Sequence, residues 1–157
     1  MVTVIGSVYQ GPDQDGDFGW MIKQPKYSDA FFIFNDNQTE FLAHQNHPNA
    51  GPDGPGCNMG GGNAVIRPYQ CKIPPQAGGI PTGEYGIPGG PGYPALTEEV
   101  KGYIKQAIAS IKQAVEDNNY SKVIFSSDGH GGLGHGIFDP CEAVKDYIVQ
   151  EINNLAN

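Results

Sequence analysis

The chain has 157 residues, which is the length of one ordinary domain and enough to bury a hydrophobic core. Hydrophobic residues make up 38% of it and charged residues only 17%, so it is neither a disordered polyelectrolyte nor a coiled coil. The formal net charge of -8, with no cluster of Lys or Arg to offset it, repels nucleic acid and anionic membranes. We therefore expect neither of these as a partner.

Three widely spaced cysteines, Cys57, Cys71 and Cys141, form no Cys-x-x-Cys pair. An odd, dispersed set of this kind makes a reducing compartment the default expectation. The N-terminus lacks the basic start and long apolar stretch of a signal peptide, and no apolar run approaches membrane-spanning length. We expect a cytoplasmic protein, and the sequence leaves open whether it forms a homo-oligomer.

The first third of the chain predicts β-strands. Val2–Tyr9 is rich in β-branched residues and ends at a Gly-Pro pair. A short strand is predicted around Trp20–Ile22, after an acidic turn that contains glycine. The run Ala30–Phe34 is continuously apolar, which is typical of a strand buried on both faces of a sheet.

Glycine and proline concentrate between residues 48 and 94, where regular structure is hard to place. A loop region of this length in a small domain is usually functional or mobile, unless short elements within it have been missed. Ala64–Arg67 is its best candidate for a strand. We therefore expect a Gly/Pro-rich loop region over about 48–94.

The last third predicts a helix, a strand and a second helix. Thr97 is a favourable N-cap for the first helix, whose apolar stripe is Val100, Ile104, Ile108, Ile111 and Val115. A buried strand is predicted at Ser121–Phe125, and Asp139–Glu142 is similar to a capping box. The apolar face of the last helix is formed by Val144, Tyr147, Ile148, Ile152 and Leu155. This order of elements favours one α/β domain over residues 1–157, with helices packed on a parallel or mixed sheet.

The segment Ser126–Phe138 is the strongest candidate for a ligand site. It follows a buried strand and precedes a helix, and ligands of open α/β sheets bind at the carboxyl ends of the strands. Five glycines within eight residues let the backbone approach a phosphate, and ordering them is costly unless the shape of the loop serves a purpose. A flexible surface loop is the alternative. The candidate ligand-binding residues here are Ser127, Asp128, Gly129, Gly131, Gly132, Gly134, Gly136, Ile137 and Phe138.

Two further segments carry groups that suit a nucleotide. Asn35, Asp36 and Asn37 follow a buried strand and could bind ribose hydroxyls or a base edge, with an ordinary Asx turn as the alternative. The turn that contains Gly61, Gly62 and Asn63 is a second candidate phosphate cradle. Arg67 could pair with an anion, although a structural salt bridge is favoured for it.

Four histidines, His44, His47, His130 and His135, offer metal ligands or acid–base groups. Cys57 is an additional ligand candidate, but no His-Glu-x-x-His motif and no close cysteine pair is present, so we predict no metal and no cofactor. An acid–base role for one histidine is slightly favoured, because imidazole titrates near neutral pH. No catalytic residue can be named from the sequence.

These pieces together resemble the macro domain family, including macro-like proteins of bacterial and phage genomes. The matching segments are residues 32–37, 60–64, 125–129 and 134–138, and Ile80–Thr82 resembles a strand between the two glycine loops. The resemblance covers roughly Phe31–Leu155. It implies a three-layer α/β/α fold that binds ADP-ribose, with the glycine loops around the diphosphate and Asn37 near the distal ribose.

Three functions are compatible with these features. The favoured one is the binding of ADP-ribose or a related nucleotide signal, cyclic nucleotides included. A phage counter-defence protein could use such binding to sequester the signal. The second is a hydrolase or phosphatase that acts on ADP-ribose derivatives and uses residues such as His44, His47, Asp128 and His130. The third is a protein-interaction module that uses the Gly/Pro-rich segment. Whether the protein is an enzyme is left open by the sequence.

Overall fold

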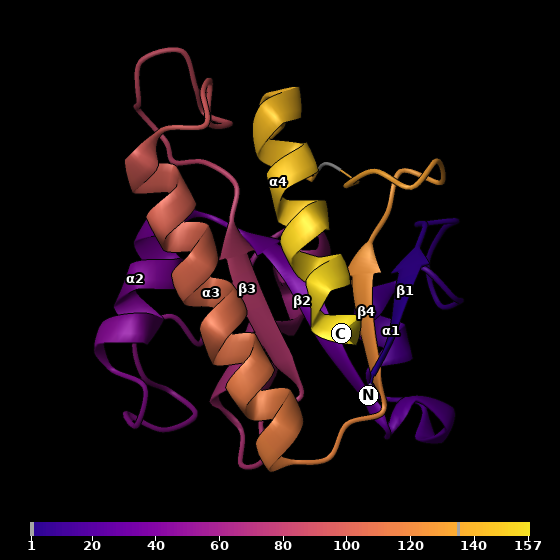
Figure 1. Ribbon diagram of the computed structural model, residues 1–157. Helices are drawn as coiled ribbons and strands as arrows, with labels where there is room; N and C mark the ends of the chain where they lie inside the picture. Colours follow the sequence, from indigo (N-terminus) through magenta and orange to yellow (C-terminus); the bar gives the residue numbers. More distant parts are fainter. Residues whose placement is uncertain (1, 135) are drawn as a thin grey trace.

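Four parallel strands form one sheet in the order β1-β4-β2-β3 (Figure 1). The computed structural model describes residues 2–134 and 136–157. The strands are β1 (Thr3–Ser7), β2 (Ala30–Asp36), β3 (Ala77–Pro81) and β4 (Lys122–Ser126). The α-helices are α1 (Phe18–Met21), α2 (Gln38–Asn46), α3 (Glu98–Asp117) and α4 (Glu142–Asn153), and the 3-10 helices are η1 (Pro25–Tyr27), η2 (Gly62–Cys71) and η3 (Asn154–Ala156). The predicted α/β fold is confirmed, and of the two sheet types that the sequence left open, parallel or mixed, the four strands form the parallel one.

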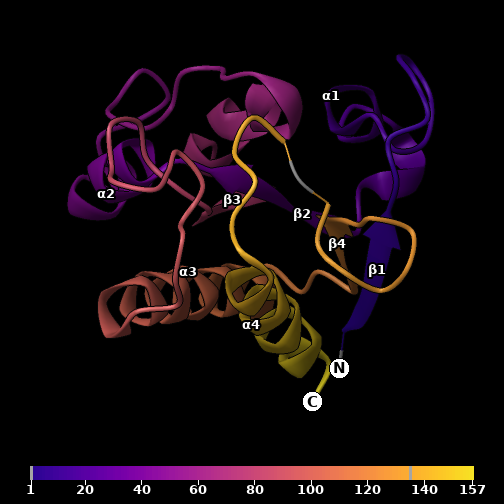
Figure 2. The same ribbon diagram turned by 90° about the horizontal axis from the view of Figure 1, so that it is seen from above.

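Helices cover both faces of the sheet. Figure 2 shows α3 and α4 on one side of the strands and α1 on the other. In β2, Phe31 and Ile33 pack into the core that α3 and α4 cover, whereas Phe32 and Phe34 pack with α1 and η2. All of these side chains are buried, as the continuous apolar run predicts for a strand between two layers.

The helix α3 begins and packs as its sequence predicts. The Oγ1 of Thr97 accepts a hydrogen bond from the N–H of Val100 at 3.1 Å, which is the predicted N-cap. The predicted stripe faces the core, with Ala107 in addition and Ile108 only partly buried. None of the described helices has the length and hydropathy needed to span a membrane.

The helix α4 begins later than the capping-box pattern predicts. Its N-cap is Cys141 and its first residue is Glu142, so the prediction of Asp139 as N-cap is wrong. The N–H of Cys141 donates to the carbonyl of Tyr93 at 2.9 Å, which holds this backbone extended. Asp139 instead lies 2.5 Å from Nζ of Lys145, one turn inside the helix.

Two predicted strands are helices in the structure. Residues 20–22 belong to α1 and its end, where the Asp17 carboxylate caps Trp20 N–H at 3.4 Å and Phe18 and Met21 are buried. Ala64–Arg67 lies within η2. Ala64–Arg67 cannot pair with β2, because β3 and β4 already pair with that strand on its two sides.

The Gly/Pro-rich region holds more regular structure than its composition predicts. Besides η2 it contains β3, which pairs with β2 from Ala77 opposite Phe32 to Pro81 opposite Asp36. This strand overlaps Ile80–Thr82, the segment for which the resemblance implies a strand. The helix α2 is not among the predicted elements, because Phe41 is its only fully buried side chain and it carries no apolar stripe.

Candidate functional site

A cavity of about 180 Å³ lies where the carboxyl end of β2 meets the two loops that the sequence singles out. The end of β2 and the start of α2 contribute polar side chains, and the turn before η2 contributes glycines. Residues after β3 and before α4 complete the wall. The lining residues are Asn35, Asp36, Asn37, Glu40, Gly60, Gly61, Asn63, Ala64, Arg67, Thr82, Tyr85, Gly136, Ile137 and Phe138.

A second cavity of about 530 Å³ adjoins the first. Both are lined by Gly60, Asn63 and Gly136, so they meet at a waist made largely of glycine. The remaining lining of the larger cavity comes from the loop before α1, from η2 and from the end of β4, namely Tyr9, Gly16, Asp17, Phe18, Gly62, Val65 and Ser126. We call the two cavities together the cleft. An elongated ligand therefore has room on both sides of the waist.

A buried ion pair supports the floor of the smaller cavity. The Nη2 of Arg67 lies 2.7 Å from Oδ1 of Asp36, and its Nε donates to the same oxygen at 3.2 Å. Only 6% of Arg67 and 3% of Asp36 is exposed. The structural salt bridge that the sequence favours for Arg67 is thus confirmed. Burial raises the pKa of Asp36, and the Arg67 charge acts against this rise.

The two asparagines of the β2 end each have one structural contact. Asn35 donates from Nδ2 to the carbonyl of Gly134 at 2.8 Å, which connects β2 to the glycine-rich loop after β4. The Oδ1 of Asn37 accepts from Glu40 N–H at 2.8 Å and caps α2. Asn37 thus serves as a helix N-cap, because its bond reaches three residues on, whereas an Asx turn reaches two. Both asparagines also line the cavity. Among the described residues, no hydrogen bond from Nδ2 of Asn37 is present, so this N–H₂ group can donate to a ligand.

The turn Gly60–Asn63 presents its backbone at the waist of the cleft. The N–H groups of Gly62 and Asn63 belong to the first turn of η2, where a helix leaves its N–H groups without an intrahelical acceptor. Gly62 has a φ of +60°, and an added Cβ there would meet nothing within 4 Å. Such a helix start attracts anions, since its N–H groups point outward and its dipole end is positive.

The loop after β4 folds back on itself. Asp128 Oδ1 accepts from the N–H groups of His130 at 2.7 Å and Gly132 at 2.9 Å, which lowers the pKa of the Asp128 carboxyl. An antiparallel bridge joins Ser127 to Leu133 and closes the loop. Six predicted ligand residues therefore lie outside the two cavities, namely Ser127, Asp128, Gly129, Gly131, Gly132 and Gly134. Their contact with a ligand stays a prediction.

An aromatic pair covers part of the smaller cavity. The rings of Tyr85 and Phe138 meet edge to face with centroids 4.8 Å apart, and they come from the loop after β3 and the segment before α4. Phe138 is buried, whereas 65% of Tyr85 is exposed. Gly61 and Ile137 also approach each other there, because a Cβ on Gly61 would lie 2.8 Å from Ile137 Cδ1. The two glycine-containing segments thus meet across the cavity.

The sequence prediction omitted several residues of the cleft. Thr82 and Tyr85 line the smaller cavity, and Tyr9 lines the larger one. Thr82 donates from both N–H and Oγ1 to the carbonyl of Asp36, at 2.9 and 3.1 Å. No local pattern marks Tyr9 and Tyr85, which lie in loops after β1 and β3. The signal for Thr82 was its place at the end of a strand that pairs with β2.

The described histidines lie away from the cleft. His44 lines a separate cavity of about 190 Å³, and burial lowers its pKa. His47 ends α2 and is exposed, as is His130 in the loop after β4. His135 lies outside the described residues. Cys57 and Cys71 form a disulfide, so the expectation of reduced cysteines does not hold for this pair, and Cys141 is free.

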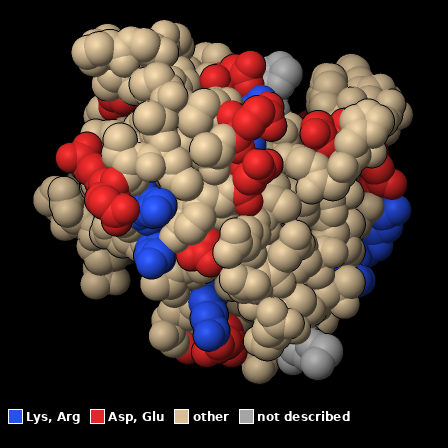
Figure 3. Space-filling model, turned by 45° about the horizontal axis from the view of Figure 1, so that its top comes forward, with Lys and Arg blue, Asp and Glu red and all other residues tan. Residues whose placement is uncertain are grey.

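The face of the molecule that is forward in Figure 3 carries no broad basic patch. Acidic side chains are spread across this face, and the basic ones form small groups beside them. In the cleft itself, the described lining contains one basic residue, Arg67, whose charge is paired with Asp36. A phosphate there would have to be held mainly by backbone N–H groups.

Comparison with known proteins gives no match, whether with protein-family models, curated protein sequences or solved structures.

Proposed function

We propose that this protein binds ADP-ribose or a related nucleotide, cyclic forms included, in the cleft. The observation that carries the proposal is the waist between the two cavities, formed by Gly60, Asn63 and Gly136. A diphosphate needs close backbone approach, which the glycines allow, and N–H donors, which Gly62 and Asn63 offer at the start of η2. The N–H of Gly60 donates to the carbonyl of Ala64 instead. Sugar and base would then extend to either side.

The two sides of the waist suit different parts of such a ligand. The smaller cavity offers the amide of Asn37 and other polar groups of the β2 end, which can bind ribose hydroxyls. The larger cavity offers Tyr9, which is 63% exposed and presents an aromatic face to a base. Its volume lies within the range of about 300–1,000 Å³ that is usual for small-molecule sites.

Binding without turnover is the form of the function that we favour. The hydrolase hypothesis rests on His44, His47, Asp128 and His130, and none of these four lines the cleft. Asp128 is already engaged by two backbone N–H groups. A protein that holds the nucleotide intact in the cytoplasm could sequester it as a signal, and in a phage this would be a counter-defence role.

Calorimetric titration with ADP-ribose, cyclic ADP-ribose and AMP tests the proposal. We expect saturable binding of at least one of the two ADP-ribose compounds, and a ligand at one hundred times its Kd should add about 2.7 kcal/mol to the unfolding free energy. Mass spectrometry of the recovered ligand then separates binding from hydrolysis. No heat and no change in Tm with any of the three would overturn the proposal.

A pair of glycine variants localises the binding. Gly136 lines both cavities and an added Cβ meets nothing within 4 Å, so Gly136→Leu should fold and obstruct the waist. We expect at least a tenfold loss of affinity, equivalent to about 1.4 kcal/mol. Gly102→Leu on the exposed side of α3 is the matched control, because a Cβ there also meets open space. Equal affinities of the two variants would place the ligand elsewhere.

A further inference from the structure

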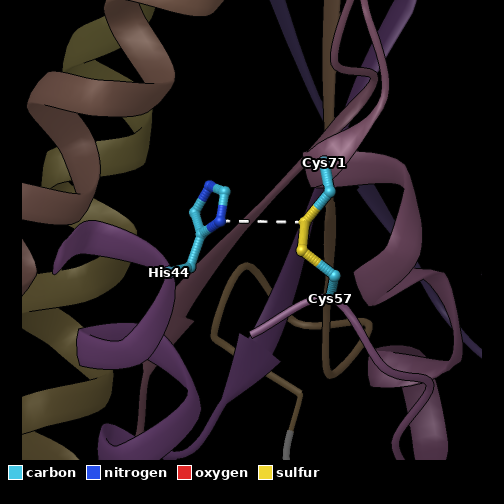
Figure 4. A group of neighbouring side chains, drawn as sticks. All are labelled: His44, Cys57 and Cys71. Carbon is cyan, nitrogen blue, oxygen red and sulfur yellow. Dashed lines mark hydrogen bonds between the residues drawn. A yellow bond between two sulfur atoms is a disulfide. The ribbon is translucent and has the colours of Figure 1, made fainter. Parts of the chain in front are cut away.

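A histidine faces a disulfide in a part of the molecule that the proposed nucleotide site does not use. His44 comes from α2, Cys71 ends η2, and Cys57 lies in the loop between them. Figure 4 shows the imidazole pointing at the two sulfur atoms, with Nδ1 of His44 3.7 Å from Sγ of Cys71. The residues around His44 line a separate cavity that shares no lining residue with the cleft.

These three side chains have donor atoms that suit a zinc site, and reduction of the disulfide lets its two sulfur atoms separate to positions around a metal ion. The ligand atoms of His44, Cys57 and Cys71 all lie within 4.8 Å of one another. In a tetrahedral zinc site, with Zn–S near 2.3 Å and Zn–N near 2.0–2.1 Å, two donors lie about 3.5 Å apart. The observed distance between Nδ1 of His44 and Sγ of Cys71 already fits this value.

We propose that His44, Cys57 and Cys71 form a zinc-binding site once the disulfide is reduced. A dithiol reductant supplies the two electrons and two protons that convert the S–S bond to two thiols, and it leaves as its own disulfide. Each thiol then gives its proton to solvent as its sulfur binds Zn²⁺. In a reducing compartment the zinc-bound dithiolate replaces the disulfide.

The surroundings of His44 suit this chemistry. Metal ligation needs a neutral imidazole, and burial lowers the pKa of His44 and so favours the neutral ring. Three protein ligands leave the fourth zinc position for water. His44 lines a cavity of about 190 Å³, which has room for a water molecule beside the imidazole. The disulfide joins the segments of Cys57 and Cys71, whereas zinc would link both of them to α2 through His44.

The experiment compares reduced with oxidised wild-type protein. The chain is reduced with dithiothreitol, desalted without oxygen and titrated with Co²⁺ and then Zn²⁺. We expect one equivalent of Co²⁺ to give an intense thiolate-to-cobalt charge-transfer band that Zn²⁺ removes, and the oxidised protein to give none. No such band in the reduced protein, or the same band in the oxidised protein, would overturn the proposal.

Variants then identify the ligands. Cys57→Ser and Cys71→Ser should each weaken the charge-transfer band, and His44→Ala should lower the Co²⁺ affinity at least about tenfold, since even loss of an outer-shell partner costs this much. Cys141→Ser and His47→Ala are the controls, one cysteine and one histidine outside the cluster. Loss of the band in Cys141→Ser, or its survival in both cluster cysteine variants, contradicts the assignment. The wild-type comparison needs no variant, so misfolding of one variant does not decide the test.

Discussion

Oδ1 of Asp36 lies 2.7 Å from Nη2 of Arg67, and both side chains are buried beneath the cleft. The pair joins the carboxyl end of β2 to η2, two elements separated by 31 residues at this contact. The other carboxylate oxygen, Oδ2 of Asp36, is buried and accepts no hydrogen bond from the described residues. The pair therefore fixes the floor of the site, and its two charges depend on each other.

Removal of Arg67 should destabilise the fold strongly. Arg67→Ala leaves the buried Asp36 carboxylate without its counter-charge, for which we expect a loss of about 3–5 kcal/mol in the free energy of unfolding, measured with urea. The pKa of Asp36, already raised by burial, should rise further. Lys122→Ala is the control, since it breaks the partly exposed pair of Lys122 with Asp29 and should cost less than about 1 kcal/mol. Similar losses of unfolding free energy in Arg67→Ala and Lys122→Ala would show that the buried pair stabilises the fold no more than an exposed pair does.

Asn37 should separate stability from binding. Asn37→Ala removes the cap of α2 and should cost about 1 kcal/mol, whereas Asn37→Asp caps the helix equally well and should keep the stability. The carboxylate lacks the N–H₂ donor, so Asn37→Asp should still lower the affinity for ADP-ribose at least about fivefold, the value of one neutral hydrogen bond. Urea unfolding and calorimetric titration give the two readouts. Wild-type affinity of Asn37→Asp would contradict the placement of the ribose.

The loop after β4 should loosen in acid. The N–H groups of His130 and Gly132 lower the pKa of Asp128 below its ordinary value of 3.8. A lowered folded-state pKa stabilises the loop above the ordinary pKa, and this contribution is lost as the pH falls through the folded-state pKa. We expect the amide signal of Gly132 in NMR spectra to titrate with a midpoint below pH 3.8. Asp128→Asn should abolish this titration, and a Gly132 midpoint at or above pH 3.8 would contradict the hydrogen bonds.

Loss of the disulfide should destabilise the chain under oxidising conditions. Cys57 and Cys71 are 14 residues apart, and cross-linking a loop of this length contributes about 3 kcal/mol by restricting the unfolded state. We expect the Cys57→Ser/Cys71→Ser double variant to lose about this much in urea unfolding with a chelator present. Cys141→Ser places a favourable N-cap residue at the start of α4 and should lose nothing. Equal stability of the double variant and the wild type would show that the bond contributes no net stability.

The sequence predicted the elements whose local pattern is strong. The apolar run of β2 and the stripe and cap of α3 were recognisable because neighbouring residues along the chain carry the whole signal. Within the cleft, the polar end of β2 and the glycines around Gly61 and Gly136 were found in the same way. Elements with weak or mixed patterns, such as α2 and η2, were missed or assigned to the wrong type.

Local sequence by itself determined that this chain forms buried strands covered by helices, with polar and glycine-rich segments at the strand ends, whereas strand pairing in the tertiary structure made the sheet parallel. Only the tertiary structure decided which of these segments share the cleft. The Asp128 loop turns back because its carboxylate binds the N–H groups of its own backbone, whereas Thr82 reaches the site because β3 pairs with β2. The contact between His44 and the disulfide likewise joins α2 to the end of η2, across 27 residues of sequence. Such contacts join residues far apart in the chain, and their free energy depends on burial and pairing that no local pattern encodes.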